Sequence, residues 1–385
     1  MSDVVLLGDV CQITMGQAPP GDSYNDKGEG LPLVAGAGDF AEATPMVKKF
    51  TTAPGKVSRQ GDIILGIRAS IGERVWSDRP YCLGRGVAGL RPFDTLDPNY
   101  LWHWLGHSAD RLRAKGRGAT FLQVNRLDIN EMEIPLPPLD EQQRIAAILD
   151  QADAIRTCRS KVLAQLGEVA QSLFLEVFGD PVHNPRGWPT HHLADLTESG
   201  LSNGAYFPKN SYGPDGVEMV HMSDVFYDQV ERGDLKRVRA SDAEIEKYCV
   251  ADHDLLVARR SLNYSGAAKP CLVPQSTEPL LYESSLIKLT PNASVVRTRY
   301  LFHLLNNRAF RRGAIAKIVT GTTIFGVSQS NLSRVQVPVP PLSIQDRFTE
   351  GLNSIDEFTL RAKESASYVD ALLPSLQSRA FAGQL

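Results

Sequence analysis

Apolar side chains recur at alternating steps of three and four residues in two long stretches of the chain, 145–173 and 348–380. This spacing places them on one narrow stripe of an α-helix, as in the seam of a coiled coil. Each stretch predicts a rod of about 38 residues and roughly 57 Å. Because a single stripe needs a partner, we expect the two helices to pack together, antiparallel by chain order. The alternative is that each helix packs on its own globular segment.

The expected seam is long enough to be described residue by residue. In the first helix it comprises Ile145, Ile148, Ala152, Ile155, Arg159, Val162, Leu166, Val169 and Leu173. In the second helix it comprises Phe348, Leu352, Ile355, Thr359, Ala362, Ala366, Val369, Leu373, Leu376 and Ala380. The side chains that we expect to hold the helix pair or to contact a partner are Ile145, Leu149, Ala152, Leu166, Leu173, Phe348, Leu352, Ile355, Val369 and Leu376. Pro374 is expected to kink the second helix.

A proline-rich segment precedes each rod, with the letters IPLPP at 134–138 and VPVPP at 337–341. Residues that precede proline disfavour the helical conformation, so each rod should begin just after its prolines. Further upstream, short apolar runs at 62–65 and 254–257 predict strands. Leucines and aromatic residues at helical spacing predict helices over 100–115 and 300–317.

These features occur twice because the chain repeats itself. GATFLQVNRLDINEMEIPLPPL, 118–139, aligns without a gap with GTTIFGVSQSNLSRVQVPVPPL, 321–342. YLWHWL and YLFHLL match upstream, as do GDIILGIR and HDLLVARR. A period near 200 residues is too long for a solenoid, so it indicates a duplicated module of globule, hinge and helix.

We therefore expect an α+β protein with two pseudo-repeated domains of mixed strands and helices and a long antiparallel helix pair. The expected boundaries are 1–133 for the first globular domain, 134–183 for the first hinge and helix, 184–336 for the second globular domain, and 337–385 for the second hinge and helix.

Composition narrows the class of protein. The chain has 385 residues, 42% hydrophobic and 22% charged, which is typical of a globular protein. No apolar run approaches the roughly 18 residues of a membrane span, and the first ten residues do not resemble a signal peptide. The five cysteines are scattered without a C-x-x-C pair, which favours a reducing compartment, so we expect a cytoplasmic protein without a membrane partner.

Charge is unevenly distributed although the net charge is only −3. Residues 297–334 contain seven basic residues and no acidic one, and residues 56–126 contain twelve basic and six acidic residues. The second half of each globular domain is therefore basic, and local charge of this kind makes a phosphate-binding face.

This order of modules resembles the specificity subunit of type I restriction–modification systems. The resemblance rests on the hinges with their helices, IPLPPLDEQQRIAAILD at 134–150 and VPVPPLSIQDRF at 337–348, and on the G-x-T windows and the GDIILGIR-type strands. The second copy departs at Ser343-Ile344-Gln345, where the first has Asp140-Glu141-Gln142.

The resemblance implies two target-recognition domains, each recognising one half of a bipartite sequence in double-stranded DNA. It also implies that the helices space these domains and dock methyltransferase subunits, two of them in the expected complex, and that a restriction and translocase subunit can join. S-adenosylmethionine, ATP and Mg would then be bound by the partner subunits, with no cofactor or metal on this chain.

The sequence offers only weak catalytic motifs. Asp97-Pro98-Asn99-Tyr100 resembles the D-P-P-Y motif of amino-methyltransferases, but the second copy keeps only the tyrosine. The stretch 84–89 is formally G-x-G-x-x-G, without the following helix and acidic residue that a dinucleotide site needs. His103 and His107 are spaced like metal ligands but lack a third ligand in sequence. We therefore expect no catalytic residues.

Candidate DNA contacts are the residues that can donate to guanine, pair with adenine or bind phosphates. In the first copy they are Arg68, Arg74, Lys115, Arg117, Thr120, Gln123, Asn125 and Arg126. In the second copy they are Arg259, Arg260, Asn263, Tyr264, Arg311, Arg312, Lys317, Thr322, Thr323, Gln329 and Asn331. The alternative for each residue is an ordinary solvated side chain, and the G-x-T glycines could equally serve a tight turn.

Two other functions remain as alternatives. One is a self-contained enzyme acting on DNA, which the missing cofactor motifs disfavour. The other is a two-headed scaffold for proteins, which the paired basic tracts disfavour.

Overall fold

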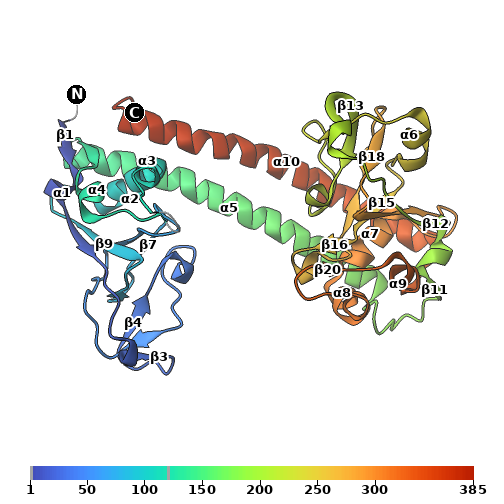
Figure 1. The fold of residues 1–385 in the computed structure, drawn as a ribbon, viewed down its shortest axis with the longest axis horizontal. Coiled ribbons are helices and arrows are strands. Elements are labelled where there is room, and N and C mark those ends of the chain that lie inside the picture. The colour runs from blue at the N-terminus through green and yellow to red at the C-terminus, as the bar shows by residue number, and fades with distance from the viewer. Residues whose placement is uncertain (1–2, 119–121) are drawn as a thin grey trace. The chain divides into compact units, whose positions relative to one another are not determined.

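The computed structural model describes residues 3–118 and 122–385. The chain forms two compact units (Figure 1). The first unit comprises Met1–Lys161 and Ala362–Leu385, and the second comprises Val162–Arg361. Each long helix contributes one part to each unit, so the units are described separately.

The first unit is built on a four-stranded antiparallel sheet in the order β2 (Cys11–Met15), β9 (Val87–Pro92), β6 (Ile63–Gly66) and β7 (Arg74–Trp76). Leu90 of β9 lies opposite Ile13 on one side and Ile63 on the other. A second sheet has the order β3 (Tyr24–Asn25), β5 (Phe50–Thr51), β4 (Leu31–Val34) and β8 (Cys82–Leu83), with β4 and β8 parallel. A separate antiparallel pair joins β1 (Asp3–Leu6) to β10 (Glu133–Leu136).

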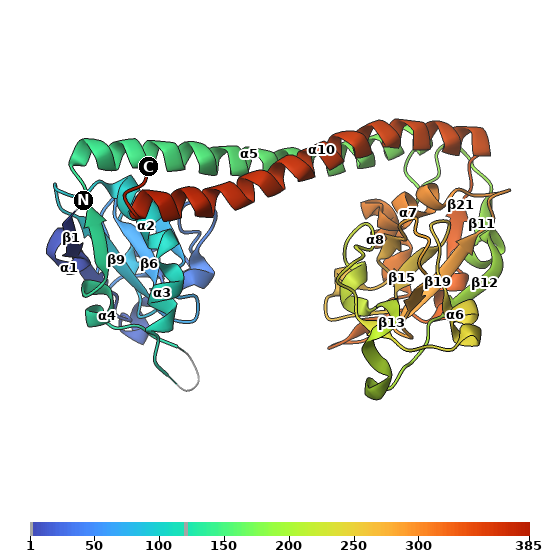
Figure 2. The same ribbon diagram turned by 90° about the horizontal axis from the view of Figure 1, so that it is seen from above.

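Four short helices complete this unit: α1 (Leu7–Val10), α2 (Pro98–His107), α3 (Ala109–Ala114) and α4 (Arg126–Asn130). The first part of α5 (Leu139–Phe178) and the last part of α10 (Leu342–Phe381) also belong to it. In Figure 2, α2 lies beside the end of α10. The ring of Phe381 packs there against Tyr100, at 5.4 Å between ring centroids, and against His107.

The second unit repeats this plan. Its main antiparallel sheet has the order β12 (Thr197–Asn203), β19 (Leu286–Pro291), β15 (Leu255–Ala258) and β17 (Pro270–Leu272). A second sheet has the order β14 (Arg237–Val238), β13 (Tyr212–Val220) and β18 (Leu280–Tyr282), with β13 and β18 parallel. β11 (Thr190–His192) pairs with β21 (Gln336–Pro338), and β16 (Arg260–Ser261) pairs with β20 (Phe325–Gly326). The helices are α6 (Asp242–Tyr248), α7 (Thr298–Asn306), α8 (Arg308–Gly313) and α9 (Gln329–Ser333).

The duplication predicted from the sequence is therefore confirmed as a structural one. Strand order and pairing in the main sheet agree between the units, as do the pairs β1–β10 and β11–β21. The predicted strands correspond to β6 and β15, each completely buried. Fully buried strands in the middle of a sheet read as continuous apolar runs, which is why they were visible in the sequence.

The predicted single helices over 100–115 and 300–317 are wrong, because each stretch forms two helices. In the second unit α7 ends at Asn306, and the side chain of Asn307 accepts hydrogen bonds from the backbone N–H groups of Ala309 and Phe310. Such a cap starts a new helix and competes with continuation of the old one. In the first unit the break falls at the buried Ser108.

Each long helix begins next to the globular part of one unit, and a buried glutamine in its first turn fixes it there. The Oε1 atom of Gln142 accepts a hydrogen bond from the backbone N–H of Asp97 at 2.8 Å. Its Nε2 donates to the carbonyl oxygens of Thr95, at 3.0 Å, and Pro137, at 2.8 Å. Both hydrogen-bonding ends of this completely buried amide are thus satisfied by backbone groups on either side of the hinge.

Gln345 makes the corresponding three bonds in the second unit. Its Oε1 accepts from the N–H of Arg297 at 2.8 Å, and its Nε2 donates to the carbonyls of Val295, at 3.2 Å, and Pro340, at 2.7 Å. The hinge sequence therefore encodes the same helix anchor twice.

The long helices contribute to two separate cores. Ile145, Leu149 and Ala152 of α5 lie in the core of the first unit with Leu373 and Ala380 of α10. The core of the second unit contains Ala170, Phe174 and Phe178 of α5 with Phe348 and Leu352 of α10. Each helix therefore packs on globular residues of both units, whereas the alternative left open by the sequence was that each helix packs only on its own globular segment.

The expected seam is not buried along its whole length. Ile155, Val162 and Val169 are 48%, 39% and 49% exposed, and α5 has no buried side chain between Ala152 and Ala170. A straight helix drifts by about 20° per heptad from a seam of period 3.5, so one stripe cannot face the same core along its whole length. The expected contacts Leu166, Leu173, Ile355, Val369 and Leu376 are half-buried. Pro374 lies within α10, which continues as one helix to Phe381.

Over the described residues, no helix combines the length and the apolar character that crossing a membrane requires.

Candidate nucleic-acid interface

In the first unit the candidate DNA contacts gather where the chain leaves β6. Arg68 and Arg117 each form an isolated β-bridge with Gln123. The backbone N–H of Val124 also donates to the carbonyl of Ile67 at 3.1 Å. The structure thus brings together the loop after β6 and the segment 115–126, which are some 50 residues apart in sequence.

The second unit repeats this arrangement. Arg260 pairs with Gly326 in the β16–β20 ladder, and Thr320 forms a bridge with the same glycine. The hydroxyl of Tyr264 donates to the carbonyl of Ala316 at 3.0 Å, and its ring meets Phe325 edge-on at 5.4 Å. The chain that follows β6 meets residues 122–124 in the first unit, and the chain that follows β15 meets β20 in the second.

Several of the candidate DNA contacts form hydrogen bonds within their own domain. Asn125 caps α4 by accepting from the N–H of Asp128, whose buried carboxylate also accepts from Arg117 at 3.0 Å. Lys115 donates to the carbonyl of Asp128 at 3.3 Å. Gln329 donates to the carbonyl of Leu201. These bonds fix the basic segment to the domain.

The G-x-T glycine of the second copy supports the alternative of a tight turn. Gly321 has a φ of +107°, and a Cβ there would lie 2.0 Å from the carbonyl oxygen of Ile324. Only glycine fits this close approach without a shift of the backbone.

Arg311 is a structural residue. Its guanidinium donates to the carbonyl oxygens of Ser265 and Ala267, both at 2.7 Å, of Ala268 at 3.1 Å and of Leu305 at 3.3 Å. Burial lowers the pKa of this guanidinium, because desolvation disfavours the charged form. Arg311 therefore joins the loop before β17 to the end of α7.

We expect Arg311→Ala to lower the free energy of unfolding of the second unit by about 2 kcal/mol or more, because it leaves buried carbonyl groups without donors. The matched control is Arg312→Ala, since Arg312 is the next residue of the same helix and is exposed. We expect the control to change the free energy of unfolding by less than about 0.5 kcal/mol. Urea unfolding measures both variants, and equal stabilities would contradict the structural role of Arg311.

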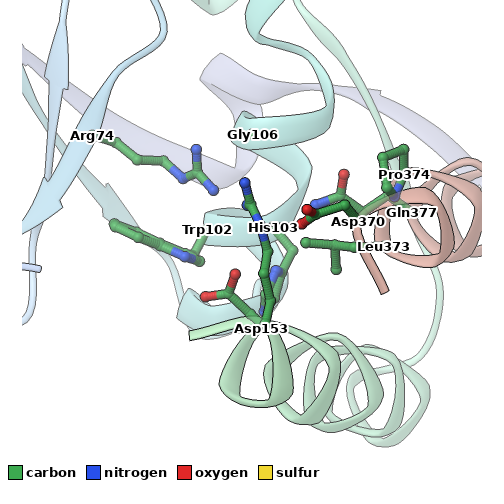
Figure 3. A pocket seen from close by; sticks show the side chains of 10 residues that line it. Arg74, Trp102, His103, Gly106, Asp153, Asp370, Leu373, Pro374 and Gln377 are labelled. Atoms are coloured by element: carbon green, nitrogen blue, oxygen red, sulfur yellow. Dashed lines mark hydrogen bonds and ion pairs between the residues drawn. The ribbon is translucent and has the colours of Figure 1, made fainter. Parts of the chain in front are cut away.

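Arg74 does not join the other arginines of its domain. Its guanidinium lies 4.4 Å from the ring centroid of Trp102, which in turn stacks on Trp76. It lines a cavity of about 370 Å³ next to α5 and α10, shown in Figure 3 with Asp153 on one side and Leu373 on the other. Burial lowers the pKa of Arg74 to about 10. Arg74 is thus placed against the helices, whereas Arg68 lines a different cavity.

Gly106 explains how this arginine is accommodated. A Cβ at Gly106 would lie 2.4 Å from a terminal nitrogen of Arg74, so a side chain there would displace the guanidinium. The buried Nε of Arg74 has no hydrogen-bond partner among the described residues.

His103 and His107 do not form a metal pair. The Nε2 of His103 lies 2.7 Å from a carboxylate oxygen of Asp150, and His107 packs on Phe381. Burial lowers the pKa of His107, which favours its neutral form. No group of three or more His, Cys, Asp or Glu side chains suited to a metal ion occurs among the residues that the structure describes.

The remaining candidates are at the surface or partly exposed. Arg259 is half-buried and donates to the carbonyl of Ser284 at 3.3 Å. The exposed candidates are Arg126, Asn263, Arg312, Lys317, Thr322, Thr323 and Asn331. Thr120 lies outside the described residues. Sequence reasoning missed Arg85, which lines the same cavity as Arg68 and Gln123; its only signal was the two glycines that flank it.

Comparison with known proteins identifies the family. The model of the type I restriction modification DNA specificity domain matches the chain twice, over residues 2–167 and 185–367. Since these matches cover most of the chain, the chain belongs to this family. It contains two copies of this DNA specificity domain.

Two curated relatives illustrate the similarity. The chain is 32% identical over 174 residues to the putative type I restriction enzyme MjaX specificity subunit of Methanocaldococcus jannaschii, covering 44% of this chain and 41% of that protein. It is 23% identical over 393 residues to the EcoKI specificity subunit of Escherichia coli K12, covering 93% of this chain and 83% of that protein. The chain thus spans less than half the length of the first relative and most of the second.

Two solved structures share the fold. The specificity subunit from M. genitalium aligns with a TM-score of 0.56 at 15% identity, over 99% of this chain and 96% of its own. A chain from a structure of type I R-M complex assembly and conformational transition aligns with a TM-score of 0.58 at 19% identity, over 100% and 98%.

Proposed function

We propose that each unit recognises one half of a bipartite sequence in double-stranded DNA. The observation that supports this most strongly is a duplicated junction, in which the chain that follows β6 or β15 meets a segment close to the next short helix, α4 or α9. Arg68 and Gln123 meet in the first unit, and Arg260 and Gly326 meet in the second. The same scaffold thus keeps an arginine at one of these positions and differs at the other, which is Gln123 in the first unit and Gly326 in the second.

We propose further that α5 and α10 pair as a coiled coil, space the two domains and dock two methyltransferase subunits, with a restriction and translocase subunit able to join. The support for pairing is that the helices contact each other in both units: Arg156 Nε lies 3.0 Å from Asp370 in the first unit, and the side chain of Leu173 packs at Gly351 in the second. The support for docking is a set of exposed apolar side chains on the helices, namely Ile155, Val162, Val169, Phe358, Leu360, Tyr368 and Leu372.

In this proposal the chain recognises DNA and catalyses no reaction itself. S-adenosylmethionine, ATP and Mg would be bound by the partner subunits, and the complex would act in the cytoplasm. The residues of the stretch Asp97-Pro98-Asn99-Tyr100 have structural roles, which supports this view. The side chain of Asp97 caps α2, and its backbone N–H donates to Gln142. The tyrosine of the same motif, Tyr100, is completely buried and donates to the carbonyl of Pro135.

A domain exchange tests the proposed function. Replacing residues 1–133 by the equivalent part of a relative should change one half of the recognised sequence and leave the other half unchanged. The measurement is methylation-motif sequencing of the exchanged chain assembled with its methyltransferase partner, with the chain alone as the control for activity. A change in both half-sites would contradict independent recognition by the two units.

A further inference from the structure

A cavity in the first unit has the character of an anion site. It has a volume of about 560 Å³ and is lined by the segment 35–38, the loop 68–70, Arg85, Gly86 and Gln123. Its polar side chains are two guanidinium groups, the hydroxyl of Ser70 and the amide of Gln123, and none of the residues lining it carries a carboxylate. Donors and positive charge therefore converge on this space.

The two arginines of the cavity have no partner, unlike two other arginines of the same unit. Arg91 binds Asp62 at 2.7 Å, and Arg117 binds Asp128 at 3.0 Å. Neither Arg68 nor Arg85 makes a side-chain hydrogen bond or ion pair with any described residue, and the Nε of Arg68 is buried without a partner. A buried donor without an acceptor is costly, so the buried Nε of Arg68 favours a ligand that accepts hydrogen bonds in this cavity.

Small residues keep one wall of the cavity open. A Cβ built on Gly36 or Gly38 would meet no atom within 4 Å, so close packing does not require glycine at either position. By contrast, Gly86 is needed for packing, because its Cβ would lie 2.4 Å from the carbonyl oxygen of Ala35. Gly36 and Gly38 therefore leave room for a ligand to approach the backbone.

We propose that this cavity holds a phosphate of the DNA backbone, clamped between Arg68 and Arg85. This inference rests on the proposed function, since it requires that the first unit binds DNA. A phosphate fits better than a guanine edge, which offers only two acceptors, O6 and N7, and is satisfied by one arginine. Two guanidiniums facing one space repel each other, and an anion with several oxygens relieves that repulsion and can accept from both.

The clamp belongs to the first unit only. The N–H of Ile67 donates to the carbonyl of Gly86, and the N–H of Arg259 donates to that of Ser285, so Gly86 and Ser285 are equivalent. The residue before each is Arg85 in the first unit and Ser284 in the second. The second unit therefore keeps the counterpart of Arg68, which is Arg260, and has a serine in place of Arg85.

The test removes charge from the protein side chains and, separately, from the DNA phosphates. It uses the full chain assembled with its methyltransferase partner. The probe is a DNA duplex that contains the sequence motif that the complex methylates. The double variant Arg68→Ala/Arg85→Ala should bind this duplex more weakly and flatten the slope of log K against log salt by about 0.9 for a lost phosphate contact. The recognised sequence should stay the same. Arg111→Ala is the matched control, since Arg111 is an exposed arginine of the same unit.

A methylphosphonate scan of the duplex identifies the contact directly. At one position, replacing the charged phosphate should weaken binding of the unmodified complex and have no effect on the double variant, because both changes remove the same interaction. An unchanged salt slope in the double variant, or a change at one base of the motif in place of a uniform loss, would overturn the phosphate clamp. If the unmodified complex did not bind the duplex at all, the proposed function itself would fail.

Discussion

Replacing Gln142 by leucine should lower the free energy of unfolding of the first unit by about 2 kcal/mol or more, since it leaves three backbone groups, of Thr95, Asp97 and Pro137, without this partner. The amide of Gln142 accepts from Asp97 and donates to Thr95 and Pro137, and none of its surface is exposed. Leucine fills a similar volume but offers neither donor nor acceptor. The loss therefore reports on hydrogen bonding more than on packing.

The neighbouring residue supplies the control. Gln143 is exposed in the same turn of α5, so Gln143→Leu should change the free energy of unfolding by no more than about 0.5 kcal/mol. Urea unfolding gives the stability, and hydrogen exchange at the backbone N–H of Asp97 gives the local effect. We expect that N–H to exchange faster in Gln142→Leu and at the normal rate in Gln143→Leu. If the two variants were equally stable, the glutamine would not anchor the helix.

The sequence predicted the features that depend on local pattern. Both long helices, the hinges that precede them and the duplication are visible because proline restricts its neighbour and because apolar periodicity follows helix geometry. The anchor was partly visible, since Gln142 and Gln345 match at the same offset as the hinges. Its role was not, because two of the three backbone groups that each glutamine binds lie in loops some 45–50 residues away along the chain.

The roles of individual arginines depend on tertiary contacts and could not be predicted. Arg311 and Arg312 are adjacent and chemically identical, yet one binds four carbonyl groups and the other is exposed. Arg74 and Arg68 are six residues apart and line different cavities. Arg85 was missed because its cavity is closed by the segment 35–38, whose glycines gave no signal by spacing alone. The sequence pattern predicted where the basic segments lie. Tertiary packing determines which of their arginines bind other groups of the protein and which do not.

Lengthening both long helices by seven residues should lengthen the spacer of the recognised sequence and leave its half-sites unchanged. The helix α5 runs without a break from the first unit, which it leaves after Lys161, into the second. Seven residues add about 10.5 Å, or roughly three base pairs at about 3.4 Å each. They turn the helix by about 700°, some 20° short of two turns, so each domain keeps nearly the same facing.

The structure indicates where such insertions do least damage. Among the described side chains, α5 has no buried residue between Ala152 and Ala170, and α10 has none between Leu352 and Leu373. Insertions after Lys161 and Lys363 therefore avoid both cores and lie outside the ion pair of Arg156 and Asp370.

Two further variants separate the paired-helix proposal from its alternatives. Inserting seven residues in only one helix should abolish methylation if the helices are paired along their length. The helix–helix contact in the first unit and that in the second could then no longer form together. Inserting four residues in each helix would rotate each domain by about 40° and should reduce activity even though the rods are longer. Methylation-motif sequencing of each variant with its partner measures both spacer and half-sites. A fully active seven-residue variant that kept the original spacer would show that the helices do not set the distance, since DNA bending or partner contacts would then determine it.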